Sequence, residues 1–130
     1  MRDEFEKYFN SNQKFPEELI KKWMFQILDG LNSLHSRKFI HIDIKLSNIM
    51  FDKNENIKII DFGTSKYTLK KTLSNTLKGT PMFIAPEILL QDQNQKIDGK
   101  VDIYSLGIIL FLLCFKQVAI NSFLICTTIY

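Results

Sequence analysis

Cysteine is scarce in this chain, with two among 130 residues. Cys114 and Cys126 both lie in an apolar stretch, and their spacing is not that of metal ligands. We therefore expect both to be small buried hydrophobic residues of a reducing compartment, and neither to be a nucleophile.

A strong excess of charge of either sign is also missing. The formal net charge is +3, and the lysines are scattered over both halves of the sequence. This balance is too small to indicate a nucleic-acid-binding protein. The first seven residues, MRDEFEK, contain no apolar core of the kind that a signal peptide needs. The sequence therefore favours a cytoplasmic or nuclear protein.

Long uninterrupted hydrophobic runs are absent as well. The segment 106–130 is apolar enough to raise the question of a transmembrane helix, but Lys116, Gln117 and Asn121 interrupt it. A membrane span needs about 20 mostly apolar residues. We therefore expect no membrane span, and a composition of 45% hydrophobic and 24% charged residues is typical of a globular chain.

Hydrophobic periodicity predicts one long helix from about Pro16 to Ser36. Proline suits the first turn of a helix, and Glu17 and Glu18 complement the helix dipole there. Apolar side chains then recur at helical spacing on one face. They are Leu19, Ile20, Trp23, Met24, Ile27, Leu28, Leu31 and Leu34.

Two further elements follow from the pattern. The apolar segments 49–51 and 57–60 flank residues 52–56, whose Asp and Asn residues suit a turn, so we expect a β-hairpin. A second helix is predicted from Asp102 to Cys114. Because it is almost wholly apolar from Leu106 onward, we expect it to be buried on every side.

The most informative residues stand between the long helix and the hairpin, and directly after the hairpin. Residues 41–48 read HIDIKLSN, and Asp61-Phe62-Gly63 begins thirteen residues after Asn48. Phosphoryl transfer needs a group that positions the attacking hydroxyl, a cation on the transferred phosphate, and oxygen ligands for Mg²⁺. These residues supply such groups: Asp43, Lys45, Asn48 and Asp61.

A third segment agrees with the first two. Residues 79–87 read GTPMFIAPE. In this order and spacing, the three segments resemble the catalytic loop, the D-F-G metal-binding turn and the A-P-E end of the activation loop of eukaryotic protein kinases, serine/threonine type.

This resemblance implies a fold. We expect an α+β, mainly α, fragment of the kinase C-lobe with a small β-hairpin, from which the N-lobe and the later C-lobe helices are absent. The kinase-like part covers residues 1–115, and the apolar tail 116–130 has no family resemblance.

The resemblance also implies a role for each polar residue of the site. Asp43 accepts or orients the substrate hydroxyl proton, and Lys45 meets the γ-phosphate of ATP. Asn48 and Asp61 hold Mg²⁺ and with it the nucleotide. The ordinary alternatives stay open: Asp43 as a turn residue, Lys45 as a surface lysine, and Asn48 as a brace of the loop backbone.

Other residues have structural or regulatory roles by the same resemblance. His41 packs on Phe62, Gly63 completes the metal-binding turn, Glu87 closes the activation loop, and Asp102 grips the catalytic-loop backbone. Four more positions follow from the family. Met50 lies under the adenine ring or in the core, Ile109 and Leu113 continue the hydrophobic stack below His41 and Phe62, and Thr80 hydrogen-bonds near Asp43.

Ile42 departs from the family pattern. It stands where most kinases have an arginine that pairs with a phosphorylated activation loop. Phosphorylation of the activation loop, for which Thr76 is the expected site, is therefore expected to change activity little.

No segment resembles the Gly-rich loop, the strand lysine or its helix glutamate. The resemblance implies a serine/threonine kinase that uses ATP and Mg²⁺ and acts on protein Ser or Thr. Because the segments that position ATP have no match, we expect this chain alone to be inactive. The alternative is a non-catalytic kinase-like interaction module or a truncated gene product. Because the later C-lobe helices that would bury the helix from Asp102 to Cys114 are absent, a chaperone or partner is expected to cover the part of it that they leave exposed.

Overall fold

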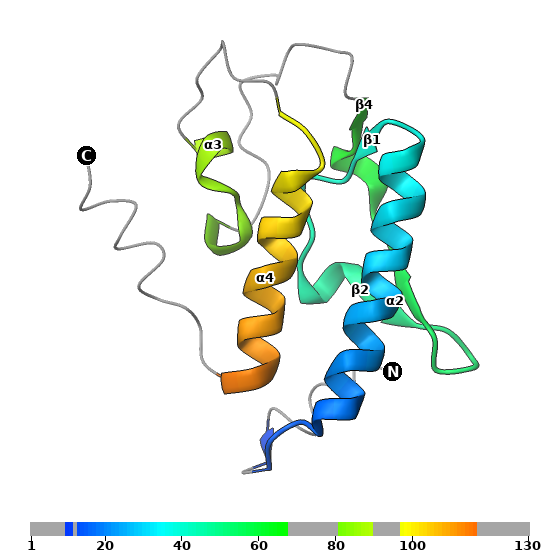
Figure 1. Ribbon diagram of the computed structural model, residues 1–130, viewed down its shortest axis with the longest axis vertical. Helices are drawn as coiled ribbons and strands as arrows, with labels where there is room; N and C mark the ends of the chain where they lie inside the picture. The colour runs from blue at the N-terminus through cyan, green and yellow to red at the C-terminus, as the bar shows by residue number, and fades with distance from the viewer. Residues whose placement is uncertain (1–9, 12, 68–80, 90–96, 117–130) are drawn as a thin grey trace, which may run out of the picture.

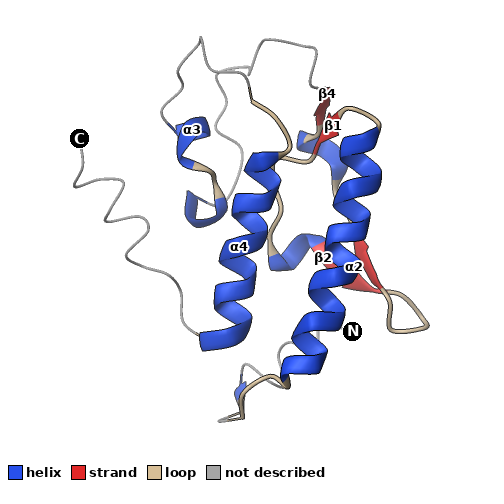
Figure 2. Ribbon diagram, in the orientation of Figure 1, coloured by secondary structure: helices blue, strands red, loops and turns tan. Residues whose placement is uncertain are grey.

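The computed structural model describes residues 10–11, 13–67, 81–89 and 97–116. Most of this structure is helical, and the short strands lie on the side of helix α2 (Figure 2). In chain order the elements are α2 (Glu17–Ser36), β1 (Phe39–Ile40), β2 (Ile49–Phe51), β3 (Ile57–Ile59), β4 (Lys66–Tyr67), α3 (Pro86–Leu89) and α4 (Lys100–Phe115). Short 3-10 turns span Leu46–Asn48, Phe62–Thr64 and Pro81–Phe83. A mainly helical fold with a small antiparallel hairpin was predicted, and it is present.

Helix α2 forms where the apolar periodicity predicted it. Pro16 precedes its first turn with φ −58°, and the chain leaves the helix at Arg37. Its buried stripe packs against β3 on one side and α4 on the other, and α2 and α4 lie side by side in Figure 1. The buried members are Ile20, Trp23, Ile27 and Leu31. Leu28, which was assigned to this apolar face, is exposed, because the buried stripe is narrower than the sequence pattern suggested.

The predicted hairpin is formed by β2 and β3. Ile49 pairs with Ile59, and Phe51 pairs with Ile57, so alternate side chains enter the core. At the turn, Asp52 Oδ1 accepts hydrogen bonds from the backbone N–H groups of Asn54 (2.8 Å) and Asn56 (2.9 Å). The bond from Asn56 is the main reason that the pKa of Asp52 lies below its ordinary value. The carboxylate therefore stabilises the turn in its ionised form.

A side chain of α2 fastens the hairpin to the helix. Gln26 Nε2 donates to Asn56 Oδ1 at 3.1 Å, and Gln26 Oε1 accepts from Ile57 N–H at 3.0 Å. Both ends of one amide are thus used at the start of β3, which fixes the hairpin along α2 in addition to its apolar packing.

A second two-stranded sheet was not predicted. Strands β1 and β4 are two residues long and pair antiparallel, with Phe39 opposite Tyr67 and Ile40 opposite Lys66. The Phe39 and Tyr67 rings meet edge to face, with their centroids 5.2 Å apart. Strands this short, far apart in the sequence, carry no alternation that a sequence reading could detect.

Helix α4 lies in the middle of the molecule between α2 and α3 (Figure 1). One face is buried in the core, where Leu106, Ile109, Leu112 and Leu113 pack. The expectation that this helix is buried on every side is wrong, because several large apolar side chains on it are exposed. They are Ile103, Leu110, Phe111 and Phe115.

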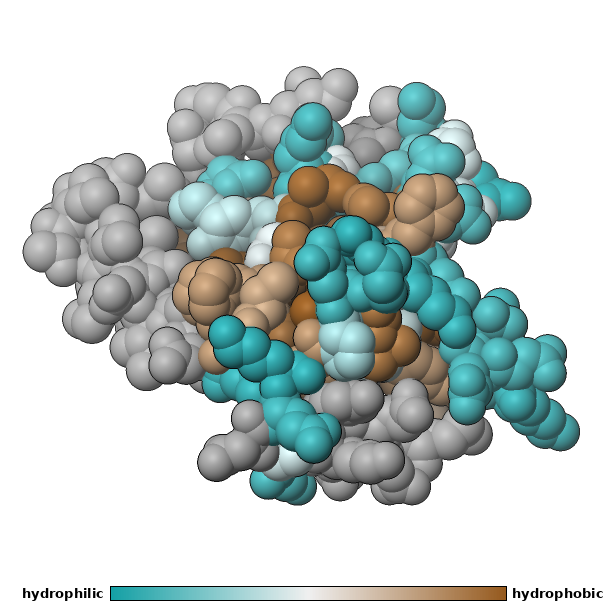
Figure 3. Space-filling view, turned by 60° about the horizontal axis from the view of Figure 1, so that its bottom comes forward, coloured by the Kyte–Doolittle hydropathy of each residue, from teal (hydrophilic) through white to brown (hydrophobic). Residues whose placement is uncertain are grey.

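Exposed apolar surface is also visible from the end of the molecule where α4 finishes. Figure 3 shows hydrophobic atoms gathered in the middle of that face, with hydrophilic side chains in front of them and to their right. Cys114, on the same helix, is half-buried, and Cys126 lies outside the described residues. Among the described helices, none combines the length and the hydropathy of a membrane span.

Candidate phosphoryl-transfer site

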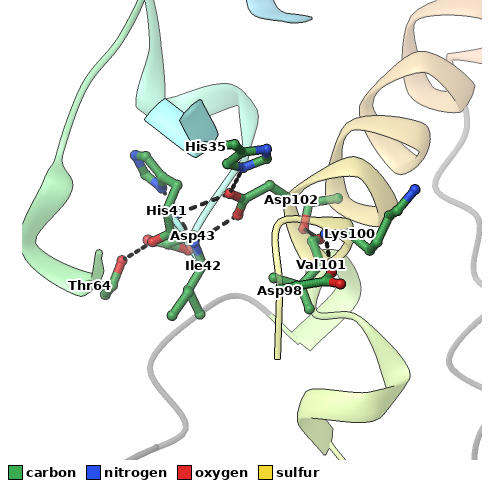
Figure 4. Close-up of polar contacts among 10 residues, drawn as sticks. His35, His41, Ile42, Asp43, Thr64, Asp98, Lys100, Val101 and Asp102 are labelled. Atoms are coloured by element: carbon green, nitrogen blue, oxygen red, sulfur yellow. Dashed lines mark hydrogen bonds and ion pairs between the residues drawn. The ribbon is translucent and has the colours of Figure 1, made fainter. Parts of the chain in front are cut away.

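The loop 41–48 begins at a buried carboxylate that belongs to α4. Asp102 Oδ2 accepts a hydrogen bond from His41 N–H at 2.9 Å, and its Oδ1 accepts one from Ile42 N–H at 2.8 Å (Figure 4). The Asp102 side chain is fully buried, at 0% exposure. A buried carboxylate is tolerated where donors satisfy its oxygens, so this grip ties the start of the loop to the first turn of α4.

Ile42 has a backbone conformation that is unusual for its side chain. Its φ is +71°, in the left-handed region that β-branched residues rarely adopt. Such a conformation costs roughly 1–2 kcal/mol and persists where the surroundings impose it. The bond from Ile42 N–H to Asp102 is one such constraint.

The polar residues of the loop converge on one carboxylate. Lys45 Nζ lies 2.7 Å from Asp43 Oδ2. Asn48 Nδ2 donates to the same oxygen at 3.1 Å and to the Asp43 backbone carbonyl at 2.8 Å. Asp43 and Asn48 are buried, and Lys45 is half-buried. Among the described residues no donor reaches Asp43 Oδ1, so that oxygen keeps its capacity to accept a proton or a hydrogen bond.

Asp61 lies beside this loop because the hairpin delivers it there. Ile60 N–H donates to the Asn48 carbonyl at 2.9 Å, which extends the β2–β3 pairing by one step beyond Ile49 and Ile59. Asp61 follows Ile60 in the chain, so it lies one residue beyond the strand position that pairs with Asn48. Its φ is +62°, its side chain is exposed, and its Oδ1 accepts from Gly63 N–H at 3.2 Å.

The donor set at this point fits Mg²⁺ held together with phosphate groups. Asn48 uses Nδ2 for both of its side-chain bonds, which leaves its carbonyl oxygen Oδ1 to act as a ligand. Asp61 keeps Oδ2. Mg²⁺ is usually bound through one or two protein oxygen donors together with substrate phosphates and water. In the described part of the chain no cluster of three or more His, Cys, Asp and Glu residues forms a metal cage.

His41 joins the loop to the turn 60–64. Its Nε2 lies 3.1 Å from the Ile60 carbonyl, which only accepts, so Nε2 carries the proton. Its Nδ1 then accepts from Asp43 N–H at 3.3 Å. The ring lies on Phe62, with a centroid separation of 5.2 Å. The structure therefore brings together the two residues that the resemblance paired.

Two residues of the site were missed by the sequence reading. His35 Nε2 lies 2.7 Å from Asp102 Oδ2 and is the third group on that carboxylate. Thr64 Oγ1 donates to the His41 carbonyl at 3.0 Å. His35 and Asp102 are 67 residues apart in the chain, so no local pattern could have linked them.

Met50 is 46% exposed, so the interpretation as a core methionine is wrong. It lies opposite Lys58, on the face of the hairpin that points away from the buried Ile49 and Phe51. Ile109 and Leu113, expected to continue the stack below His41 and Phe62, are buried in the core.

The A-P-E segment is described only in part. Glu87 is half-buried in the first turn of α3, and no described cation pairs with it. The preceding turn is held to α4, because Ser105 Oγ donates to the Phe83 carbonyl at 2.6 Å. The predicted regulatory and specificity positions Thr76 and Thr80 lie outside the described residues.

Comparison with known proteins gives one consistent result. The family model described as "Protein kinase domain" matches residues 1–122. Similar proteins include the ovarian-specific serine/threonine-protein kinase Lok of Drosophila melanogaster, 36% identical over 78% of this chain and 22% of its own length. Serine/threonine-protein kinase kin-29 of Caenorhabditis elegans is 42% identical over 75% of this chain and 12% of its own. Human serine/threonine-protein kinase Nek11 is 39% identical over 86% and 17%.

The chain thus spans less than a quarter of the length of each of these relatives. The matched residues include the whole site: the loop 41–48, the turn at Asp61 and the anchor Asp102. By this match and these relatives, the chain belongs to the eukaryotic protein kinase family, serine/threonine type.

Proposed function

We propose that these 130 residues carry the phosphoryl-transfer and Mg²⁺-binding groups of a protein kinase that phosphorylates serine or threonine in protein substrates. The observation that carries the proposal is the contact of Lys45 Nζ and Asn48 Nδ2 with one oxygen of Asp43. A base or positioner, a cation and an amide thus meet within one eight-residue loop, and the hairpin places Asp61 beside it. Phosphoryl transfer is catalysed mainly by positioning and by electrostatic stabilisation, which this arrangement provides.

Asp43 orients the substrate hydroxyl and accepts its proton through Oδ1, the oxygen that Lys45 and Asn48 do not use. Lys45 turns from Asp43 toward the transferred phosphate, a short move for a half-buried side chain that ends in a flexible ammonium group. The pair thus keeps both charges partly compensated before substrate binds.

Asn48 Oδ1 and the Asp61 carboxylate would hold Mg²⁺, and Met50 would contact the nucleotide from the exposed face of the hairpin. When bound, Mg²⁺ neutralises charge on the ATP phosphates. Hydrogen bonds from Asn48 Nδ2 to Asp43 keep the amide oriented so that its oxygen, and not its nitrogen, is offered to the metal.

The chain alone is expected to be inactive, since none of its residues match the Gly-rich loop or the strand lysine that position ATP. Purified residues 1–130 should not transfer labelled phosphate from ATP to a generic basic protein. A full-length protein that contains them should do so, and Asp43→Asn should lower its turnover by about 10² to 10⁴. Near-normal turnover of the Asp43→Asn variant would overturn the catalytic role assigned to Asp43. If the isolated chain transfers phosphate and Asp43→Asn abolishes that transfer, the expectation that the chain alone is inactive is wrong.

A second candidate function is a non-catalytic kinase-like interaction module. The exposed apolar side chains on α4 favour it, because soluble monomers rarely expose large contiguous apolar patches. Expressed alone, a catalytic segment that lacks its covering should be insoluble, oligomeric or chaperone-bound, and should bind a hydrophobic dye at neutral pH. A monodisperse monomer with a sharp unfolding transition would show that the chain is stable without any further covering, which would favour the interaction module.

A further inference from the structure

The turn 60–64 is tied to His41 at three points. Before Asp61, the Ile60 carbonyl accepts from His41 Nε2. After it, the Phe62 ring lies against the His41 ring. Thr64 Oγ1 donates to the His41 backbone carbonyl at 3.0 Å (Figure 4). The Thr64 bond is therefore the hydrogen bond that closes the turn onto the catalytic loop on the far side of Asp61.

Asp61 depends on its surroundings for its position. It is exposed, its φ of +62° is in the left-handed region, and Gly63 N–H is the one described donor to its carboxylate. The 3-10 turn that follows is three residues long, and Ser65 N–H donates to the Phe62 carbonyl at its end. Such short turns have poor hydrogen-bond geometry, so they need external contacts to stay in one conformation.

The bond from Thr64 also links the turn, through His41, to the buried carboxylate of Asp102. His41 accepts from Thr64 through its carbonyl and donates its own N–H to Asp102. The N–H of the next residue, Ile42, donates to Asp102 as well. Asp102 is fully buried. Thr64 thus connects the exposed Asp61 turn to the part of the loop that the buried Asp102 holds.

We propose that Thr64 is a positioning residue for the Mg²⁺ site, and that its hydroxyl holds Asp61 at a fixed place relative to Asn48. The proposal rests on the proposed function, in which Asn48 and Asp61 bind the metal. A hydroxyl is required, because the His41 carbonyl only accepts. The contact of His41 with Ile60 and the β1–β4 pairing remain when the hydroxyl is lost, so metal binding should weaken and not vanish.

The test uses the full-length protein and three variants: Thr64→Val, which is isosteric without the donor, Thr64→Ser, which keeps it, and Asp61→Asn. One readout is the Mg²⁺ concentration for half-maximal phosphate transfer at saturating ATP. The other is Mn²⁺ binding to the protein with a non-hydrolysable ATP analogue, followed by the electron paramagnetic resonance of free Mn²⁺. Thr64→Val should raise both half-saturation concentrations about three- to tenfold, the effect of losing one hydrogen bond, and Thr64→Ser should stay within about twofold.

The other outcomes distinguish the role of the Thr64 hydroxyl from the assignment of Asp61 as a metal ligand. Thr64 does not act through its hydroxyl if Asp61→Asn abolishes metal binding while Thr64→Val leaves both half-saturation concentrations unchanged. The same conclusion follows if Thr64→Ser raises these concentrations as much as Thr64→Val does. A lower melting temperature for Thr64→Val without a shift in metal dependence would likewise overturn the inference. Should Thr64→Val not fold, Thr64→Ala serves as the second donor-free variant. Normal Mn²⁺ binding and transfer in Asp61→Asn would instead overturn the metal assignment itself.

Discussion

Asp102 and Asp61 carry the same carboxylate in opposite surroundings. Asp102 is fully buried on α4, and both its oxygens are occupied, by His41 N–H, Ile42 N–H and His35 Nε2. Asp61 is exposed at the end of the hairpin, and Gly63 N–H is its one described donor. The first therefore serves the fold, and the second keeps coordination capacity for a ligand.

The energetic reason is desolvation. A carboxylate without water costs several kcal/mol unless donors replace its hydration, so Asp102 must stay fully bonded. Asp61 keeps its hydration and gives it up only to a ligand with stronger attraction, such as a divalent cation. Substitutions at the two positions should thus separate stability from catalysis.

The largest effect is expected for Asp102→Ala. The change leaves the N–H groups of His41, which is buried, and Ile42, which is half-buried, without an acceptor, and it removes the partner of His35. The free energy of unfolding should fall by about 3–5 kcal/mol, the range for breaking a buried charged network. Chemical denaturation measures this loss, and phosphate transfer by the full-length protein should vanish with it.

Asp102→Asn is the matched control, because the amide keeps one accepting oxygen. Its loss of stability should be clearly smaller than that of Asp102→Ala. Equal stability of Asp102→Ala and the parent protein would mean that the grip on the loop contributes nothing to the fold.

Asp61→Ala should lower turnover far more than the free energy of unfolding. Its side chain is exposed and its one described bond is the capping contact from Gly63 N–H, so the free energy of unfolding should fall by only about 0.5–2 kcal/mol. Turnover of the full-length protein should fall on the order of 10² to 10⁴, because the metal ligand acts on the transition state. A large loss of stability with retained turnover would reverse the roles assigned to the two carboxylates.

Gly99→Ala tests the support behind Asp102. A Cβ at Gly99 would lie 2.6 Å from His35 Nδ1 and 2.7 Å from its Cε1, so either the His35 ring or the backbone at Gly99 must shift. Overpacking of this kind typically costs about 1–3 kcal/mol, which thermal or chemical unfolding detects.

Gly107→Ala is the control, at a position inside helix α4, whereas Gly99 directly precedes that helix. No atom lies within 4 Å of a Cβ at this exposed helical position, so alanine should stabilise by about 0.5–1 kcal/mol. Similar effects at Gly99 and Gly107 would show that helix propensity, and not the contact with His35, decides the outcome.

The smallest expected effect concerns a third carboxylate, Asp52, which holds the hairpin turn. The pKa of Asp52 is depressed in the folded protein, first by the backbone N–H of Asn56, so the folded state binds a proton less readily than the unfolded chain. Its contribution to stability is therefore present above the ordinary pKa of Asp and is lost as the pH falls through the lowered value. Asp52→Asn should flatten the pH dependence of unfolding in this acidic window, and an unchanged profile would show that the turn does not rely on the charge.

Sequence patterns predicted the large elements well. Helix α2 and the β2–β3 hairpin form within a residue of their expected ends, because apolar spacing and turn residues report directly on local structure. Helix α4 is two residues longer at its start and one at its end than expected. The same patterns failed where the answer depended on distant residues: the β1–β4 pairing, the exposure of Leu28 and Met50, and the open face of α4.

The sequence by itself determined the chemistry of this protein: an Asp, a Lys and an Asn on one loop, an Asp after the hairpin, and the family to which they belong. Only the tertiary structure decided how these groups are held. Asp102 grips His41 and Ile42 from about 60 residues away, and Thr64 returns to His41 from the next turn. Such contacts depend on the packing of α2 and α4 and on which polar groups lose their water, and neither quantity is local to the chain.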